Sequence, residues 1–146
     1  MNPENLCLLA AGAYFLTGLL TGVWKYACIA GTERAQAPVY VDVAHRASLM
    51  YAFSALLLRA FVPYSPLSVP ATVWLVAVPL LFFAGAIASY VLHGLLRDTD
   101  NQFRKPYRLG RGTLPGILLH GFMVALAIGE IGAFVLLFYG FVRTLL

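Results

Sequence analysis

Four long apolar runs, separated by short polar or proline-rich stretches, dominate the pattern of this chain. They predict helices over residues 6–30, 42–62, 71–96 and 113–142. Each run has the roughly 20 residues that a helix needs to cross the hydrocarbon core of a bilayer. The connections leave no room for a second compact unit. We therefore expect an all-α fold, an integral membrane four-helix transmembrane bundle, with residues 1–146 forming one domain.

Composition supports a membrane protein. The chain is 61% hydrophobic and 11% charged, and its mean hydropathy is +0.82, whereas soluble domains carry about 25% charged residues. The first apolar run has no basic segment before it and is longer than the core of a signal peptide, so we expect a membrane span. The net charge of +4 does not indicate nucleic acid, because the basic residues flank the apolar runs.

Lysine and arginine predict the orientation. Most lie in or beside the two hydrophilic connections, 31–38 and 97–112, namely Lys25, Arg34, Arg46, Arg97, Arg104, Lys105, Arg108 and Arg111. The opposite side holds Arg59 and Arg143. Cytoplasmic loops of membrane proteins are enriched in such residues. We therefore expect both connections in the cytoplasm, both termini outside it, and a bacterial inner membrane as the location.

Small residues in the first helix predict a close helix contact. Gly12, Gly18 and Gly22 allow a neighbouring helix to approach, because small residues dominate helix interfaces in lipid. Cys7 and Cys28 lie near opposite ends of this helix, about 31 Å apart at helical rise. That separation excludes a disulfide between them within one chain.

The three histidines of the chain, His45, His93 and His120, lie on three different predicted helices. Each is within about two turns of the predicted cytoplasmic end, so all three fall within about 10 Å of one plane. An ionisable group inside a membrane is a functional-site hypothesis, and imidazole is a common ligand of metals and haem iron. Two interpretations stay open: interfacial histidines bonded to carbonyls or headgroups, or ligands that surround a common prosthetic group.

Glu130 is the second polar feature of the apolar runs. His120, Met123, Ala127 and Glu130 follow a spacing that places them along one seam of the fourth helix. A carboxyl group in mid-membrane needs a partner or a proton. Arg59 is the candidate partner if the second and fourth helices touch, and the alternative is that its side chain extends outward to the interface. Transport of a proton or small solute through Glu130 is one further hypothesis.

The chain resembles the styrene oxide isomerase family over its second to fourth helices. The residues that carry the resemblance are Ala44-His45, Pro63, Tyr90 and Asn101-Gln102-Phe103. Proteins of that family are small trimeric four-helix membrane proteins that hold haem b near the cytoplasmic side. The resemblance implies a homotrimer in the lipid bilayer that isomerises a small lipophilic epoxide to a carbonyl compound, with ferric haem as the Lewis acid.

The resemblance also implies roles for individual residues. His45 would be the axial ligand of the haem iron, Tyr90 would orient the substrate, and Tyr51 would line the pocket. Arg46 and Arg97 would pair with the haem propionates, and His93 and His120 would lie around the cofactor or beside its propionates. Two positions differ from the family, because Tyr51 stands in place of an amide and Phe82 in place of an acid.

Two other functions stay open. The segments AHRASLMYAFSALLL and YVLHGL also resemble the MAPEG proteins, which are trimeric membrane glutathione transferases and eicosanoid enzymes. That resemblance implies glutathione as the cofactor, held by Arg46, Arg108 and Arg111. The family's asparagine, glutamate and arginine are replaced by Ala47, Met50 and Tyr90, respectively. The third possibility is a non-catalytic membrane subunit or partner-binding protein whose polar residues serve assembly.

Overall fold

The computed structural model describes residues 2–146, and its α-helices account for most of them. The elements in chain order are α1 (Pro3–Ala30), α2 (Val39–Phe61), the short 3-10 helix η1 (Val62–Tyr64), α3 (Val69–Leu96), β1 (Arg108–Leu109), β2 (Gly112–Thr113) and α4 (Gly116–Val142). All four α-helices are long and apolar enough to cross a membrane. The predicted all-α bundle with four spans is confirmed at this level, and it indicates an integral membrane protein.

The helix ends differ from the predicted ones by a few residues, for local reasons. α1 begins at Pro3, because the Asn2 side chain accepts a hydrogen bond from the Glu4 N–H at 2.9 Å and caps the helix. α4 begins at Gly116, because the preceding residues form an antiparallel hairpin that pairs Arg108 with Thr113. Gly110 occupies the turn of this hairpin at φ +60°, a conformation that glycine adopts without steric cost.

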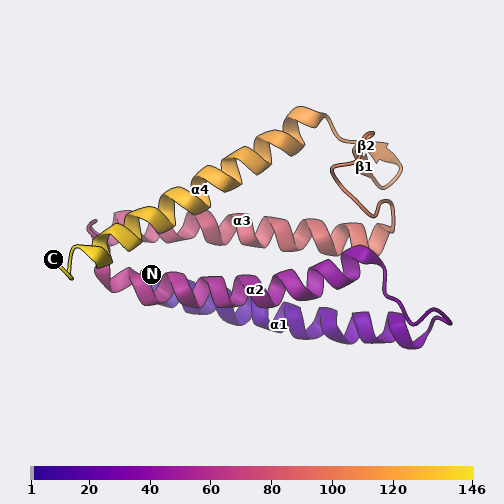
Figure 1. The fold of residues 1–146 in the computed structure, drawn as a ribbon, viewed down its shortest axis with the longest axis horizontal. Coiled ribbons are helices and arrows are strands. Elements are labelled where there is room, and N and C mark those ends of the chain that lie inside the picture. The colour runs from indigo at the N-terminus through magenta and orange to yellow at the C-terminus, as the bar shows by residue number, and fades with distance from the viewer. Residues whose placement is uncertain (1) are drawn as a thin grey trace.

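The four helices run along one long axis but do not pack equally (Figure 1). α1, α2 and α3 lie side by side, whereas α4 contacts them at its C-terminal end and leans away toward its N-terminal end. Both chain ends and η1 lie at one end of the bundle, and the α1–α2 connection and the hairpin lie at the other. The two basic connections are therefore on one side, as the charge pattern predicts.

The core lies among α1, α2 and α3, with one contribution from α4. Its buried side chains include Cys7, Ala11 and Tyr14 of α1, Ala52, Ala55 and Leu58 of α2, Val76, Leu80, Phe83 and Ile87 of α3, and Leu137 of α4. The Tyr14 hydroxyl donates a hydrogen bond to the Leu80 carbonyl, which ties α1 to α3. Cys7 is buried and both cysteines are free, as the spacing predicts.

Two of the three glycines expected at a helix interface face α2. A Cβ on Gly18 would lie 2.6 Å from Leu49, and a Cβ on Gly22 would lie 2.9 Å from the His45 ring. A Cβ on Gly12 would meet nothing within 4 Å. The close approach of α1 and α2 therefore depends on Gly18 and Gly22, and it brings α1 directly against His45.

Candidate functional site

His45 lies on α2, half-buried against α1. Its Nδ1 is 2.8 Å from the carbonyl oxygen of Gly18. A carbonyl can only accept, so Nδ1 carries the hydrogen and donates it. In the neutral ring this leaves the lone pair on Nε2. The contact therefore fixes both the orientation and the tautomer of His45, and Gly22 provides the space that the ring needs.

An apolar groove lies between α1 and α2, separated from His45 by the close contact of Gly18 with Leu49. It has a volume of about 470 Å³ and is lined by Leu8, Ala11, Gly12, Phe15, Ala52, Phe53 and Leu56. His45, Leu49, Ala52 and Leu56 follow helical spacing, so they share one stripe of α2. Ala52 is about 10 Å from His45 along the helix axis. His45 therefore shares a stripe of α2 with the groove but is not part of its lining.

His93 is buried at the junction between α3 and the connection that follows it. Its Nδ1 is 2.8 Å from Oδ1 of Asp98, and the two side chains are 4% and 3% exposed. The second Asp98 oxygen accepts a hydrogen bond from the Gly110 N–H. The ring of Tyr40 lies against His93 with 5.0 Å between centroids, and its hydroxyl accepts from the Gln102 N–H at 2.6 Å. His93 therefore anchors the connection to the bundle.

The same contacts determine the direction in which the pKa of Asp98 is shifted. Burial by itself would raise the pKa of this carboxyl group, but the hydrogen bonds from His93 and from the Gly110 backbone outweigh that effect. The pKa of Asp98 therefore lies below its ordinary value. The ionised carboxylate is the form that holds this junction together.

His120 is exposed near the start of α4, and its Nε2 is 2.9 Å from the Tyr107 hydroxyl. The three histidines thus lie near the same end of the bundle, but each has its own partners. Within residues 2–146, no three histidine, cysteine or acidic side chains come together as metal ligands. The structure does not gather His45, His93 and His120 around a common centre within one chain.

A second cavity lies between α2, α3 and α4, where α4 leans away. Its volume is about 280 Å³, and its polar lining consists of Tyr51, Ser89, Tyr90 and Gln102. The Ser89 hydroxyl donates to the Gln102 side chain at 3.1 Å. Both tyrosines predicted as site residues therefore reach one cavity, which we call the tyrosine cavity. Ser89 was missed by sequence reasoning, because a single serine in an apolar helix carries no distinctive signal.

The tyrosine cavity and His45 lie on different faces of α2. Tyr51 is six residues after His45, which turns it about 120° around the helix. Tyr51 stacks on Phe83 with 4.5 Å between centroids, and Tyr90 stacks on Tyr40 with 6.1 Å between centroids. Tyr51 of α2 therefore faces α3, and Tyr90 of α3 faces α2, whereas His45 faces α1. One chain does not bring the predicted ligand and the predicted substrate residues together.

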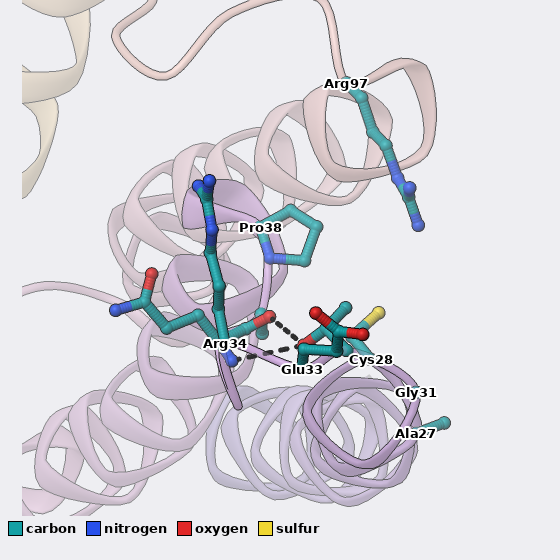
Figure 2. A pocket seen from close by; sticks show the side chains of 10 residues that line it. Ala27, Cys28, Gly31, Glu33, Arg34, Pro38 and Arg97 are labelled. Atoms are coloured by element: carbon teal, nitrogen blue, oxygen red, sulfur yellow. Dashed lines mark hydrogen bonds between the residues drawn. The ribbon is translucent and has the colours of Figure 1, made fainter.

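The two arginines predicted to pair with the haem propionates, Arg46 and Arg97, also lie apart from each other. Arg46 bonds to Asp42 through Nε and Nη2, each at 2.8 Å, and Asp42 also pairs with Lys25 at 2.6 Å. Arg97 lies at an open recess of about 850 Å³ beside the α1–α2 connection. Figure 2 shows Arg97 and Arg34 projecting from different sides of this recess. Arg46 and Arg97 thus belong to different surroundings.

The hairpin carries the other two arginines that the glutathione alternative requires. Arg108 lies in β1 and Arg111 lies in the turn after it, and both are exposed. Arg46 lies instead on α2, where it is bonded to Asp42. These three side chains therefore come from separate surroundings rather than from one described pocket.

Glu130 lies on α4 with one carboxyl oxygen, Oε1, buried and without a hydrogen-bond partner among the described residues. Arg59, the partner expected from the sequence, approaches Glu4 of α1 at 4.0 Å instead. The expected Arg59–Glu130 pair is therefore wrong. Arg59 lies near the end of α2, where the acidic side chain at the start of α1 is its neighbour.

Comparisons with known protein families, with curated proteins and with solved structures found no match for this chain. The candidate functions therefore depend on the chemistry of the residues described above and on the resemblance that the sequence motifs carry.

Proposed function

We propose that this chain is a haem b-binding integral membrane protein similar to styrene oxide isomerase, and that it isomerises a small lipophilic epoxide to a carbonyl compound. The observation that carries the proposal is the hydrogen bond from His45 Nδ1 to the Gly18 carbonyl. Histidines that ligate metals donate their other ring N–H to a carbonyl or carboxylate, which fixes the ring and its tautomer. His45 has this arrangement and presents Nε2 as the ligand atom.

An apolar groove on the same stripe of α2 supports a large apolar cofactor near His45. The groove has a volume within the range of small-molecule and cofactor sites, about 300–1,000 Å³. Its lining on α2 begins at Ala52, about 10 Å from His45 along the helix axis. The other histidines suit the role less well, because His93 is enclosed with Asp98 and Tyr40 and the Nε2 atom of His120 is engaged by Tyr107.

The tyrosine cavity is the proposed substrate pocket. Its volume of about 280 Å³ suits a small hydrocarbon epoxide. The Tyr90 hydroxyl would donate a hydrogen bond to the epoxide oxygen, and Tyr51 would line the pocket. Bound ferric haem would supply a Lewis acid for opening the epoxide ring. The apolar side chains around the two tyrosines would exclude water and so disfavour hydrolysis of the substrate.

A homotrimer would complete the site. His45 and the tyrosine cavity face different directions in one chain, so a neighbouring copy has to bring its tyrosine cavity to His45. The exposed apolar side chains along the groove between α1 and α2, Leu8, Phe15, Phe53 and Leu56, suit either lipid or such a neighbour. Native mass spectrometry of the detergent-purified protein should give a trimer, and a monomer with bound haem would contradict this arrangement.

We also propose that the basic connections face the cytoplasm of a bacterial cell, with both termini on the opposite side of the inner membrane. The concentration of lysine and arginine at one end of the bundle supports this orientation. Reporter fusions to the C-terminus should therefore be active only when the reporter works outside the cytoplasm.

Replacing His45 with alanine should abolish the Soret band of the purified protein after haem supplementation, because the axial ligand is lost. Absorption spectra of the oxidised and reduced protein measure this. His45→Gly with added imidazole should restore the band, and His120→Ala should keep it, because the Nε2 atom of His120 is engaged by Tyr107. A colourless wild-type protein, even with added haem, would contradict the proposed function.

A further inference from the structure

A third cavity lies between α2, α3 and α4, farther from the hairpin than the tyrosine cavity. Its volume is about 300 Å³, and its lining is Ser54, Leu57, Leu58, Pro79, Phe83, Glu130, Ile131, Phe134 and Val135. Tyr51 lines the tyrosine cavity and stacks on Phe83, which lines this one, so the stacked pair marks the boundary between them. Glu130 is the one ionisable side chain in the lining, and we call this space the glutamate cavity.

Glu130 is deep in the membrane-spanning part of α4. It lies about 21 Å from Gly116 and about 18 Å from Val142 along the axis, at 1.5 Å per residue. Its Oε1 is buried without a partner among residues 2–146. The Ser54 hydroxyl, the other polar group of the lining, already donates to the Met50 carbonyl at 3.0 Å. The described chain therefore leaves this oxygen unsatisfied.

A carboxyl group in this position needs a proton or a cation. An isolated carboxylate in an apolar medium costs far more free energy than a neutral carboxylic acid, and intramembrane carboxyl groups pair with a partner or mark a functional pathway. Arg59 does not supply this cation, because its side chain approaches Glu4 instead. A ligand that brings its own cationic hydrogen-bond donor would satisfy the unpaired carboxyl oxygen of Glu130.

We infer that the glutamate cavity binds a lipophilic amine whose ammonium group pairs with Glu130. The neutral amine enters from the bilayer, its nitrogen takes the proton of the Glu130 carboxyl group, and the resulting ammonium donates hydrogen bonds to the carboxylate. The proton moves from oxygen to nitrogen, and no other reactant is needed. The pair is strong here, because charges in a low-dielectric site attract more strongly than in water.

The rest of the cavity fits the body of such a ligand. Phe83 and Phe134 contribute aromatic rings to the lining, and aromatic faces attract ammonium groups. Leu57, Ile131 and Val135 are 51%, 64% and 58% exposed, so the cavity opens sideways toward lipid. A ligand would therefore reach Glu130 from the bilayer rather than from water, which selects for apolar molecules.

Binding of radiolabelled 4-phenylbutylamine to the protein in nanodiscs of zwitterionic lipid tests this inference. Glu130→Gln should weaken binding about 10- to 100-fold, because it removes a charge-assisted hydrogen bond. Glu4→Gln is the matched control and should leave binding unchanged, because Glu4 lies near the start of α1 outside the cavity. 4-Phenylbutanol, which lacks the cation, should bind the wild type weakly. Equal binding of the amine to the wild type and Glu130→Gln would overturn the inference.

A second measurement uses the wild-type protein alone and so does not depend on how the variant folds. Dicyclohexylcarbodiimide adds to protonated carboxyl groups in apolar surroundings, and mass spectrometry should find the adduct on Glu130. 4-Phenylbutylamine should slow this labelling severalfold, and 4-phenylbutanol should not. Absence of the Glu130 adduct, or no protection by the amine, would overturn the inference. Neither measurement involves haem, so its outcome is separate from the test on His45.

Discussion

Replacing Gly140 with alanine should lower the free energy of unfolding of the bundle by about 3 kcal/mol, because overpacking a tight contact forces backbone to move. A Cβ at this position would clash with the backbone carbonyl oxygen of Tyr64 and would lie 3.0 Å from Pro66. Backbone of η1 cannot turn aside as a flexible side chain can. We expect the C-terminal end of α4 to separate from η1. Unfolding of the purified protein in mixed micelles, followed by circular dichroism, measures the change.

α4 is especially sensitive to this substitution, because few of its residues are buried. Its buried residues are Ala133, Leu137 and Gly140, all in its C-terminal half. Gly132→Ala is the matched control, since a Cβ there would meet nothing within 4 Å. That variant should be neutral or slightly stabilising, because alanine favours helix over glycine by roughly 0.5–1 kcal/mol. Equal destabilisation by both variants would show that α4 does not dock through Gly140.

The four spans could be predicted because their signal is long and unambiguous. Runs of some 20 apolar residues have few stable states other than a membrane helix, in which all backbone groups are bonded internally. The helix ends were less predictable. The cap by Asn2 and the pairing of Arg108 with Thr113 depend on single residues in short polar segments. Local side-chain contacts therefore shift a boundary that hydropathy locates only approximately.

The sequence predicts where the candidate residues lie along each helix but not the direction in which they face. Counting residues from the helix ends places His45, His93 and His120 toward the same end of the bundle, because helical rise is constant. Which face of α2 meets α1 and which meets α3 depends on the packing of all three helices. His45 faces α1 and Tyr51 faces α3 for that reason. The position of α4, and with it both cavities beside α2 and α3, depends on contacts such as Gly140 with η1.

The contacts of His93 also could not be predicted from the sequence. A histidine near a helix C-terminus is favoured by the helix dipole, so its position carries no specific sign of a partner. Asp98 follows within five residues and Gly110 follows much later, yet both meet at one carboxylate. The contact forms only because the connection folds back and the hairpin turn lies over the end of α3. That closure depends on the whole connection rather than on a motif.

Replacing Asp98 with alanine should lower the free energy of unfolding by about 3 kcal/mol, because two buried donors lose a carboxylate acceptor at once. His93 and the Gly110 N–H would both lose their acceptor. Asp98→Asn should cost about 2 kcal/mol, since its amide has one acceptor oxygen and leaves one buried donor unsatisfied. Chemical unfolding of the detergent-purified variants measures both values. Asp100→Asn is the matched control, because Asp100 and its partner Arg104 are exposed, and it should change stability by less than about 0.5 kcal/mol.

The same carboxylate predicts a pH dependence with a definite sign. The pKa of Asp98 is lower in the folded protein than its ordinary value, so the unfolded chain binds the proton more tightly. Its contribution to stability is therefore complete above the unfolded pKa of about 3.9 and is lost as the pH falls through the lower, folded pKa. The difference in stability between the wild type and Asp98→Asn should be constant above about pH 4 and should shrink below it. If the stability difference between the wild type and Asp98→Asn stays constant in stronger acid, the prediction is contradicted. The shape of the Asp98 side chain, and not its charge, would then hold the connection against α3.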